Sequence, residues 1–149
     1  MSSPHKSVAI PEAAPDEDMG PTSLNPPGWP RPKGYANGMA AQGKVVITGG
    51  VVGWDQMGKF PDGFVAQAGR CFLNIRAILA AGGAEPRHLV RLTWYVTDIE
   101  AYLAYPRELG EAYRTAFGRH FPAMAVVEVK RLVERAALLE VEATAVVPA

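Results

Sequence analysis

Several segments of this chain are apolar on both faces of a predicted strand, and this pattern limits the folds that the chain can adopt. They are Val45–Ile47 with Val51–Val52, Leu92–Val96 and Ala123–Val129. A strand of this kind needs cover on both sides of its sheet. The chain offers two amphipathic helices, which can cover one face only. We therefore expect a copy of the same chain to cover the second face.

The periodicity elsewhere predicts an α+β domain with the element order ββαβαββ. The predicted strands are Tyr35–Ala41, Lys44–Gly53, Leu89–Thr97, Met124–Val133 and Ala137–Val147. The turn residues Gln42–Gly43 predict a hairpin between the first two strands. In the third strand, Val90, Leu92, Trp94 and Val96 are expected on one face, with Arg91, Thr93, Tyr95 and Thr97 on the other.

Two helices are predicted from apolar residues at helical spacing. The first carries the stripe Phe64, Ala68, Phe72, Ile75 and Leu79, with Gln67, Arg70 and Asn74 on its opposite flank. It is expected to end at Gly82–Gly83. The second begins at Pro106 and carries the stripe Leu109, Ala112, Tyr113, Ala116 and Phe117. Between the third strand and this helix, Asp98 is expected to cap a turn. Both helices are expected on one face of a mixed sheet.

The first 33 residues differ from the rest in composition. They are rich in proline, serine and charge, and proline fixes φ and biases the preceding residue away from helix. We interpret residues 1–33 as a flexible Pro-rich tail and collar, and residues 34–149 as one domain.

Charge and cysteine content exclude several classes of protein. Lys plus Arg and Asp plus Glu both number 15, so no net field attracts nucleic acid or a membrane surface. The chain shows no secretory signal pattern and no apolar run of bilayer length. The single Cys71 cannot form an internal disulfide. These features favour a cytoplasmic protein that binds a small molecule and has neither nucleic acid nor membrane as a partner.

The usual nucleophiles and metal ligands are missing from the predicted domain. Every serine lies in the tail, so a Ser-His-Asp triad is excluded, and Cys71 beside the first helix stripe is expected to be a buried structural thiol. The three histidines lack metal-ligand spacing, so no metal is expected. Gly53–Lys59 resembles a phosphate-binding loop, but Phe60-Pro61 follows where a hydroxyl and a helix are needed. A glycine-rich surface loop is the better interpretation.

Three acids stand within otherwise apolar strands: Glu128, Glu140 and Glu142. By strand alternation Glu140 and Glu142 share a face with Thr144, opposite Leu139, Val141 and Ala143. They are ordinary polar residues if that face meets solvent. If an oligomer buries the face or makes it line a cleft, they become candidates for acid–base chemistry.

Together these residues resemble the YjgF/RidA family. The likeness covers about Tyr35 to Val147, and no single piece of it is specific, whereas the order and spacing are. The pieces are Val46–Gly50, Ala66–Ala68 with Asn74–Ile75, Val90–Asp98, Phe121–Ala123, Val127–Val129, Arg131–Leu132 and Glu140–Ala143. The resemblance implies a chorismate-mutase-like fold, a homotrimer, and a small-molecule site in each cleft between subunits. It also implies hydrolysis of 2-imino acids or their enamine tautomers without metal or cofactor.

The resemblance also implies site residues. Glu140 falls at the acid proposed to position or activate water, Tyr35 at a site-lining tyrosine, and Gly49–Gly50 at a Ser-Gly beside the pocket. Met124 stands where the family has the arginine that binds the substrate carboxylate, and Val126 stands where many members have cysteine.

A thioether cannot replace charge-assisted hydrogen bonds to a carboxylate. Trp54, Trp94, Tyr95 and Met124 would suit a more apolar or aromatic ligand, although each is more often simple core. Arg91, Lys130 or Arg131 of a neighbouring subunit are candidate replacement anchors.

Two functions are therefore compatible with the sequence. One is a deaminase that hydrolyses an imine, enamine or related reactive C–N compound, with Glu140 as the general acid–base and a substrate range altered from 2-imino acids. The other is a non-catalytic trimeric module that binds a small ligand in the same clefts.

Overall fold

The computed structural model of the chain describes residues 20–149. Residues 1–19, which belong to the expected tail, lie outside the described part. A four-stranded mixed sheet forms the centre, in the order β3–β6–β4–β5, and all neighbours are antiparallel except β4 and β5. These strands are β3 (Lys44–Ile47), β4 (Leu89–Val96), β5 (Ala123–Glu128) and β6 (Leu139–Val147).

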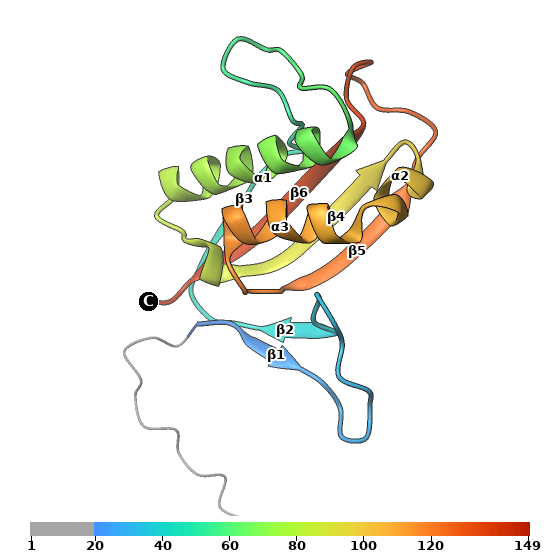
Figure 1. Cartoon of the computed structure of the whole chain (residues 1–149). Coiled ribbons are helices and arrows are strands. Elements are labelled where there is room, and N and C mark those ends of the chain that lie inside the picture. Colours follow the sequence, from blue (N-terminus) through green and yellow to red (C-terminus); the bar gives the residue numbers. More distant parts are fainter. Residues whose placement is uncertain (1–19) are drawn as a thin grey trace, which may run out of the picture.

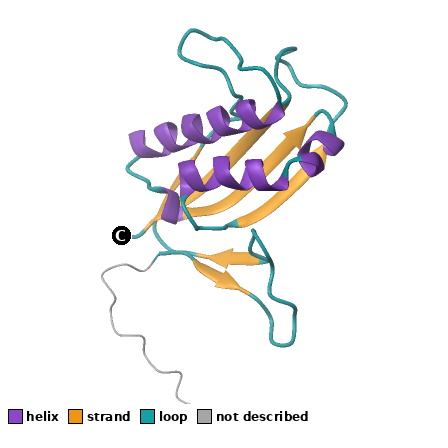
Figure 2. Ribbon diagram, viewed as in Figure 1, coloured by secondary structure: helices purple, strands orange, loops and turns teal. Residues whose placement is uncertain are grey.

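The helices lie on one face of this sheet (Figure 1). The long helices are α1 (Phe64–Ala81) and α3 (Pro106–Phe117). A short helix, α2 (Ile99–Ala104), precedes α3, and a 3-10 turn at Pro86–His88 precedes β4. Figure 2 shows the helices in one layer and the sheet behind them. The predicted α+β class, the mixed sheet and the one-sided helices are confirmed.

The core fills the space between α1, α3 and the sheet. The whole predicted stripe of α1 is buried, and Phe72 at its centre contacts Trp94, Tyr113 and Phe117 with ring centroids 5.1, 5.8 and 5.5 Å away. Such aromatic contacts add to the gain from burying apolar area. No helix within residues 20–149 is both long and apolar enough to cross a bilayer.

The alternation predicted for β4 holds except at its start. Leu92, Trp94 and Val96 face the helices, but a β-bulge lies between Leu89 and Arg91. The extra residue of the bulge is Val90, so Leu89 is buried in the place that strict alternation assigns to Val90. Beyond the bulge the expected two faces are restored.

The predicted hairpin at Gln42–Gly43 is wrong. Residues Gly38–Ala40 form β2, which pairs antiparallel with β1 (Thr22–Leu24) in a separate two-stranded sheet. Figure 1 shows this small sheet apart from the main one. The next strand, β3, pairs with β6 instead. At Gly43 the chain passes so close to β6 that a Cβ there would overlap the backbone carbonyl of Val147, and φ is 144°. The glycine serves this close approach and not a hairpin turn.

Two polar residues of α1 differ from the prediction because they bind the backbone of neighbouring loops. Gln67 is only 4% exposed, and its amide donates to the carbonyls of Pro61 and Ala136 and accepts from Leu138 N at 2.8 Å. Asn74 donates to the carbonyls of Val52 and Trp54. Both amides therefore connect α1 to neighbouring loops through hydrogen bonds to backbone groups.

Helix α2 was expected only as a turn. Asp98 is its N-cap, and its Oδ1 accepts a hydrogen bond of 3.0 Å from Glu100 N. Replacing Asp98 with alanine removes this acceptor and is expected to lower the free energy of unfolding by about 0.5–2 kcal/mol. Asp98→Asn keeps a capping oxygen and is the matched control. Urea denaturation of the two variants measures the difference, and equal losses would show that capping is not the cause.

Candidate functional site

The sheet face opposite the helices is open in the protomer. Its side chains are Val45 and Ile47 of β3, Glu140, Glu142 and Thr144 of β6, Arg91, Thr93 and Tyr95 of β4, and Ala125 and Val127 of β5. The apolar members lie toward the two edges, where Val45, Ile47 and Val127 are 62%, 67% and 43% exposed. At one end of this face Ala123 and Val146 are only 8% and 9% exposed, and Ala36 pairs with Ala123, so the face is open over its remaining part. Large apolar side chains left exposed in this way are typical of a surface that a partner covers.

Glu140 lies on this open face, beside an irregularity of the neighbouring chain. After β3, Thr48 N donates to Ala143 O, while Thr48 Oγ1 accepts from Ala143 N at 3.0 Å. Regular backbone pairing resumes at Val51 and Val141. Gly49–Gly50 therefore bulge out of the ladder next to Glu140.

The bulge leaves room for the Glu140 carboxyl group. A Cβ built on Gly50 would lie 2.6 Å from both Cδ and Oε1 of Glu140, so a larger residue would displace the carboxylate. At Gly49 the same test finds open space. Among the described residues, no group donates a hydrogen bond or forms an ion pair with Glu140. An unpaired carboxylate beside an open surface is free to bind water and to exchange protons.

The other two strand acids have partners. Glu142 Oε1 accepts a hydrogen bond of 2.7 Å from the Tyr95 hydroxyl, and this bond to a carboxylate raises the pKa of Tyr95. Glu128 Oε1 accepts from Ile99 N at 3.0 Å, at the start of α2. Both acids therefore have structural contacts within the protomer, which distinguishes Glu140 from them.

The remaining predicted site residues lie on the helix side of the sheet. Tyr35, Trp94, Met124 and Val126 line one cavity of about 710 Å³ between β4–β5 and α2–α3, which we call the β5 pocket. Its volume is within the range of small-molecule sites. Backbone contact holds Tyr35 there, because the next residue, Ala36, donates to Pro122 O at the start of β5.

The sequence-predicted site is thus divided between two faces of the sheet. Met124 pairs with Leu92 and Val126 with Trp94, and these residues face the helices. Glu140 pairs with Tyr95 on the open face. A sheet separates the two sets within one protomer, so they can form one site only if different copies of the chain contribute them.

Trp94 carries an unsatisfied polar group at the β5 pocket. The residue is 3% exposed, and its Nε1 has no acceptor among the described residues. Its ring meets Tyr102 edge to face, with centroids 5.5 Å apart. A buried N–H without an acceptor costs about 1–3 kcal/mol, which is uncommon in a folded protein unless a ligand or a change of conformation supplies the partner.

Comparison with known proteins assigns the family. Residues 30–147 match the family described as Endoribonuclease L-PSP. The 2-iminobutanoate/2-iminopropanoate deaminase of Escherichia coli K12 is 30% identical over 112 residues, which are 75% of this chain and 86% of that protein. The chain belongs to the YjgF/RidA family. A RutC family protein of Aquifex aeolicus is 32% identical over 112 residues, covering 73% of this chain and 86% of that protein.

Solved structures of this family share the fold. The Rid family protein YyfB from Yersinia pestis superposes with a TM-score of 0.76 at 25% identity, covering 87% of this chain and all of that one. The YjgF protein of E. coli superposes with a TM-score of 0.62 at 29% identity, covering 86% and 93%. The YjgF/RidA-like fold expected from the sequence is confirmed.

Several residues considered from the sequence lie outside the β5 pocket of this YjgF/RidA chain. Arg91 is on the open face, Lys130 and Arg131 are in the connection after β5, and none of the three lines the β5 pocket. Trp54 lies in the loop before α1, where its ring is 6.1 Å from Phe60. The sequence reasoning missed Arg114, which does line the β5 pocket.

Cys71 and the glycine-rich loop have structural contacts. The Cys71 thiol is fully buried and donates to Val51 O at 3.1 Å, and burial raises its pKa to about 12, so it is no nucleophile at neutral pH. Asp55 Oδ1 accepts from the backbone N–H groups of Met57 and Lys59, which lowers the pKa of Asp55. A carboxylate thus occupies the inside of this loop, where a phosphate-binding loop needs free N–H groups.

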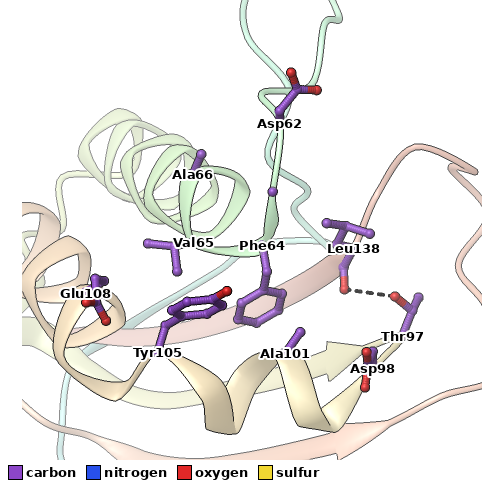
Figure 3. A pocket seen from close by; sticks show the side chains of 11 residues that line it. Asp62, Phe64, Val65, Ala66, Thr97, Asp98, Ala101, Tyr105, Glu108 and Leu138 are labelled. Atoms are coloured by element: carbon purple, nitrogen blue, oxygen red, sulfur yellow. Dashed lines mark hydrogen bonds between the residues drawn. The ribbon is translucent and has the colours of Figure 1, made fainter.

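A second cavity, of about 740 Å³, lies between the start of α1 and the α2–α3 segment, and its charge is negative. Figure 3 shows Phe64 and Tyr105 in its wall, together with the carboxylates of Asp62, Asp98 and Glu108. No lysine, arginine or histidine lines it. None of the sequence-predicted site residues lies there. The described residues hold no group of three or more potential metal ligands.

Proposed function

We propose that this protein is a hydrolytic deaminase of a reactive imine, enamine or related small C–N compound. The observation that carries the proposal is the unpaired Glu140 carboxylate, for which Gly50 leaves room on the open face of a YjgF/RidA fold. Support also comes from the E. coli relative named 2-iminobutanoate/2-iminopropanoate deaminase, which shares 30% identity over most of its length.

The reaction asks little of the protein. The imine carbon is already electrophilic, so water adds its oxygen to carbon while the nitrogen gains a proton. The C–N bond of the resulting aminol then breaks, ammonia leaves with another proton, and a carbonyl remains. Glu140 can take a proton from water and pass it to the imine nitrogen in the first step, and then take the hydroxyl proton of the aminol and pass it to the departing nitrogen in the second. Positioning of the water and the substrate supplies the rest.

We further propose a homotrimer whose copies cover one another's open faces. The exposed Val45, Ile47 and Val127 favour such cover. A contact between copies would also bring a Glu140 from one chain to the β5 pocket of another. The small-molecule site then lies in the cleft between subunits.

The substrate range is proposed to differ from that of the E. coli deaminase. Met124 and Val126 line the β5 pocket with apolar groups, and Met124 cannot make the charge-assisted hydrogen bonds that hold a carboxylate. Other members of the family can differ from this chain in the residues that line this pocket. We therefore expect the pocket residues of this chain to determine its substrate range.

The test is a rate measurement with imines generated in the cuvette by amino-acid oxidases from a panel of small, branched and aromatic amino acids. We expect ammonia and the carbonyl product to appear faster than in the spontaneous reaction for at least one member. Equal rates with and without the protein across the panel would overturn the proposal.

The absence of an arginine at position 124 favours a second candidate, a non-catalytic trimeric module that binds a small ligand. It predicts saturable binding of a ligand in the cleft without acceleration of any imine hydrolysis. Turnover that depends on Glu140, measured in the same assay, would exclude it.

A further inference from the structure

The β5 pocket combines an aromatic interior with a positively charged mouth. Trp94, Tyr102, Phe121 and Val126 contribute to its walls, and Lys33 and Arg114 also line it. Trp94 is buried, whereas Lys33 and Arg114 are exposed. No aspartate or glutamate lines the pocket. An organic anion with an apolar body complements such a cavity, because its charge meets the cations while its body is removed from water.

Arg114 is placed to bind an anion because it has no other partner. Within residues 20–149, no carboxylate forms an ion pair with its guanidinium. The side chain lies over Gly110, one turn earlier on α3, where a Cβ would be 3.1 Å from Nη1. Gly110 therefore leaves room for the guanidinium at the pocket. An arginine whose guanidinium has no ion-pair partner can offer several N–H donors to a carboxylate.

The charge continues into a neighbouring cavity of about 470 Å³. It shares Gly34, Tyr35 and Phe121 with the β5 pocket, adds Arg31 and Arg119, and also has no acidic residue in its lining. On the other side of α2–α3 the cavity shown in Figure 3 carries three carboxylates and no cation. The cavities on the two sides of this helical segment thus carry charges of opposite sign, and only the cavities on the β5 side attract anions.

The unpaired indole N–H of Trp94 is the second, independent observation. It belongs to a residue of the pocket wall that is almost completely buried. A molecule that reaches this wall and carries a hydrogen-bond acceptor would give Nε1 the partner that the described residues do not provide.

From these observations we infer that the β5 pocket binds an aromatic 2-oxo or 2-imino acid, with its carboxylate on Arg114 at the mouth and its ring directed toward Trp94. Arg114 thereby takes the anchoring task that Met124 cannot perform, and a ring substituent with an acceptor oxygen reaches Trp94 Nε1. Whether this molecule is a substrate or a product depends on the proposed deaminase function. The inference that the pocket binds it does not depend on that function.

Binding is measured by isothermal titration calorimetry on the full chain with phenylpyruvate, the stable carbonyl product of such a hydrolysis. We expect saturable binding, weaker by at least tenfold for pyruvate, which lacks the ring. Arg114→Met is expected to weaken phenylpyruvate binding about 10- to 100-fold, because charge-assisted hydrogen bonds to the carboxylate are lost. Arg107→Met is the matched control, since Arg107 is on the same helix, exposed, and outside the pocket.

The Trp94 contact is tested with 4-hydroxyphenylpyruvate. It should bind more tightly than phenylpyruvate to the wild-type protein, and Trp94→Phe should abolish this difference while both acids still bind. Absence of phenylpyruvate binding, or equal affinities in the Arg114→Met and Arg107→Met proteins, would overturn the inference. If binding follows these expectations while no imine is hydrolysed, the deaminase proposal fails and the pocket assignment stands.

Discussion

Glu140→Gln is expected to lower the turnover of a responsive imine by about 10²- to 10⁴-fold, the usual contribution of a positioned acid–base group. Glutamine keeps nearly the same shape beside Gly50, so the fold and the affinity for ligand are expected to remain. The measurement is initial-rate kinetics with oxidase-generated imines, together with calorimetric binding of a stable 2-oxo acid. The loss should therefore appear in kcat and not in the dissociation constant.

Glu142→Gln is the matched control for this prediction. Glu142 is on the same strand and the same face, but its carboxylate accepts the Tyr95 hydroxyl and thus has a structural partner. We expect its loss to change turnover by less than about tenfold, in contrast with the larger contribution of a positioned acid–base group. A loss of the same size in both variants would assign the effect to the strand and not to Glu140.

Local patterns predicted the parts of the fold that local forces decide. The stripe Phe64 to Leu79 fixes the buried face of α1, and the alternation around Leu92 and Trp94 fixes the two faces of β4. Pro106 and Gly82 mark the start of α3 and the end of α1 because their backbone preferences act at helix ends.

Pairing between distant segments could not be predicted in the same way. The Gln42–Gly43 signal is typical of a hairpin, yet β2 pairs with β1, which lies in a proline-rich segment that local composition assigns to a collar. Gly43 is required by the approach of Val147, a contact that no local window contains. Gln67 and Asn74 were misplaced for a related reason, since their partners are backbone groups of loops far along the chain.

The candidate site was predicted residue by residue, but not its arrangement. Strand alternation placed Glu140 opposite Val141 correctly, but alternation within single strands cannot tell that Met124 of β5 and Glu140 of β6 lie on different faces of the sheet. Arg114 was missed because an arginine on the polar side of an amphipathic helix has the pattern of a solvated residue. The sequence does hold one indication of this role. Gly110 and Arg114 are four residues apart and therefore neighbours on the helix surface, and the missing side chain at Gly110 leaves space beside the guanidinium.

The division of the site between two sheet faces leads to a prediction about mixed oligomers. Gly110 lines the β5 pocket, so Gly110→Trp is expected to fill it with the indole ring. The helix should accept the new side chain, because a Cβ at Gly110 contacts only the flexible end of Arg114 and glycine is itself unfavourable inside a helix. Gly110→Trp should abolish turnover in its own homotrimer, as Glu140→Gln does in another. The first variant keeps every Glu140, and the second keeps every pocket.

Refolding the two inactive variants together is expected to give mixed trimers with about a third of wild-type turnover, because in a cyclic trimer that holds both variants about one contact in three joins an intact pocket to an intact Glu140. Differently tagged chains, purified through both tags and assayed for ammonia release, provide the measurement. Each variant refolded alone is the control and should stay at background. If the mixture also stays at background although mixed trimers are isolated, Glu140 and the β5 pocket do not act on one substrate, and the shared site is wrong.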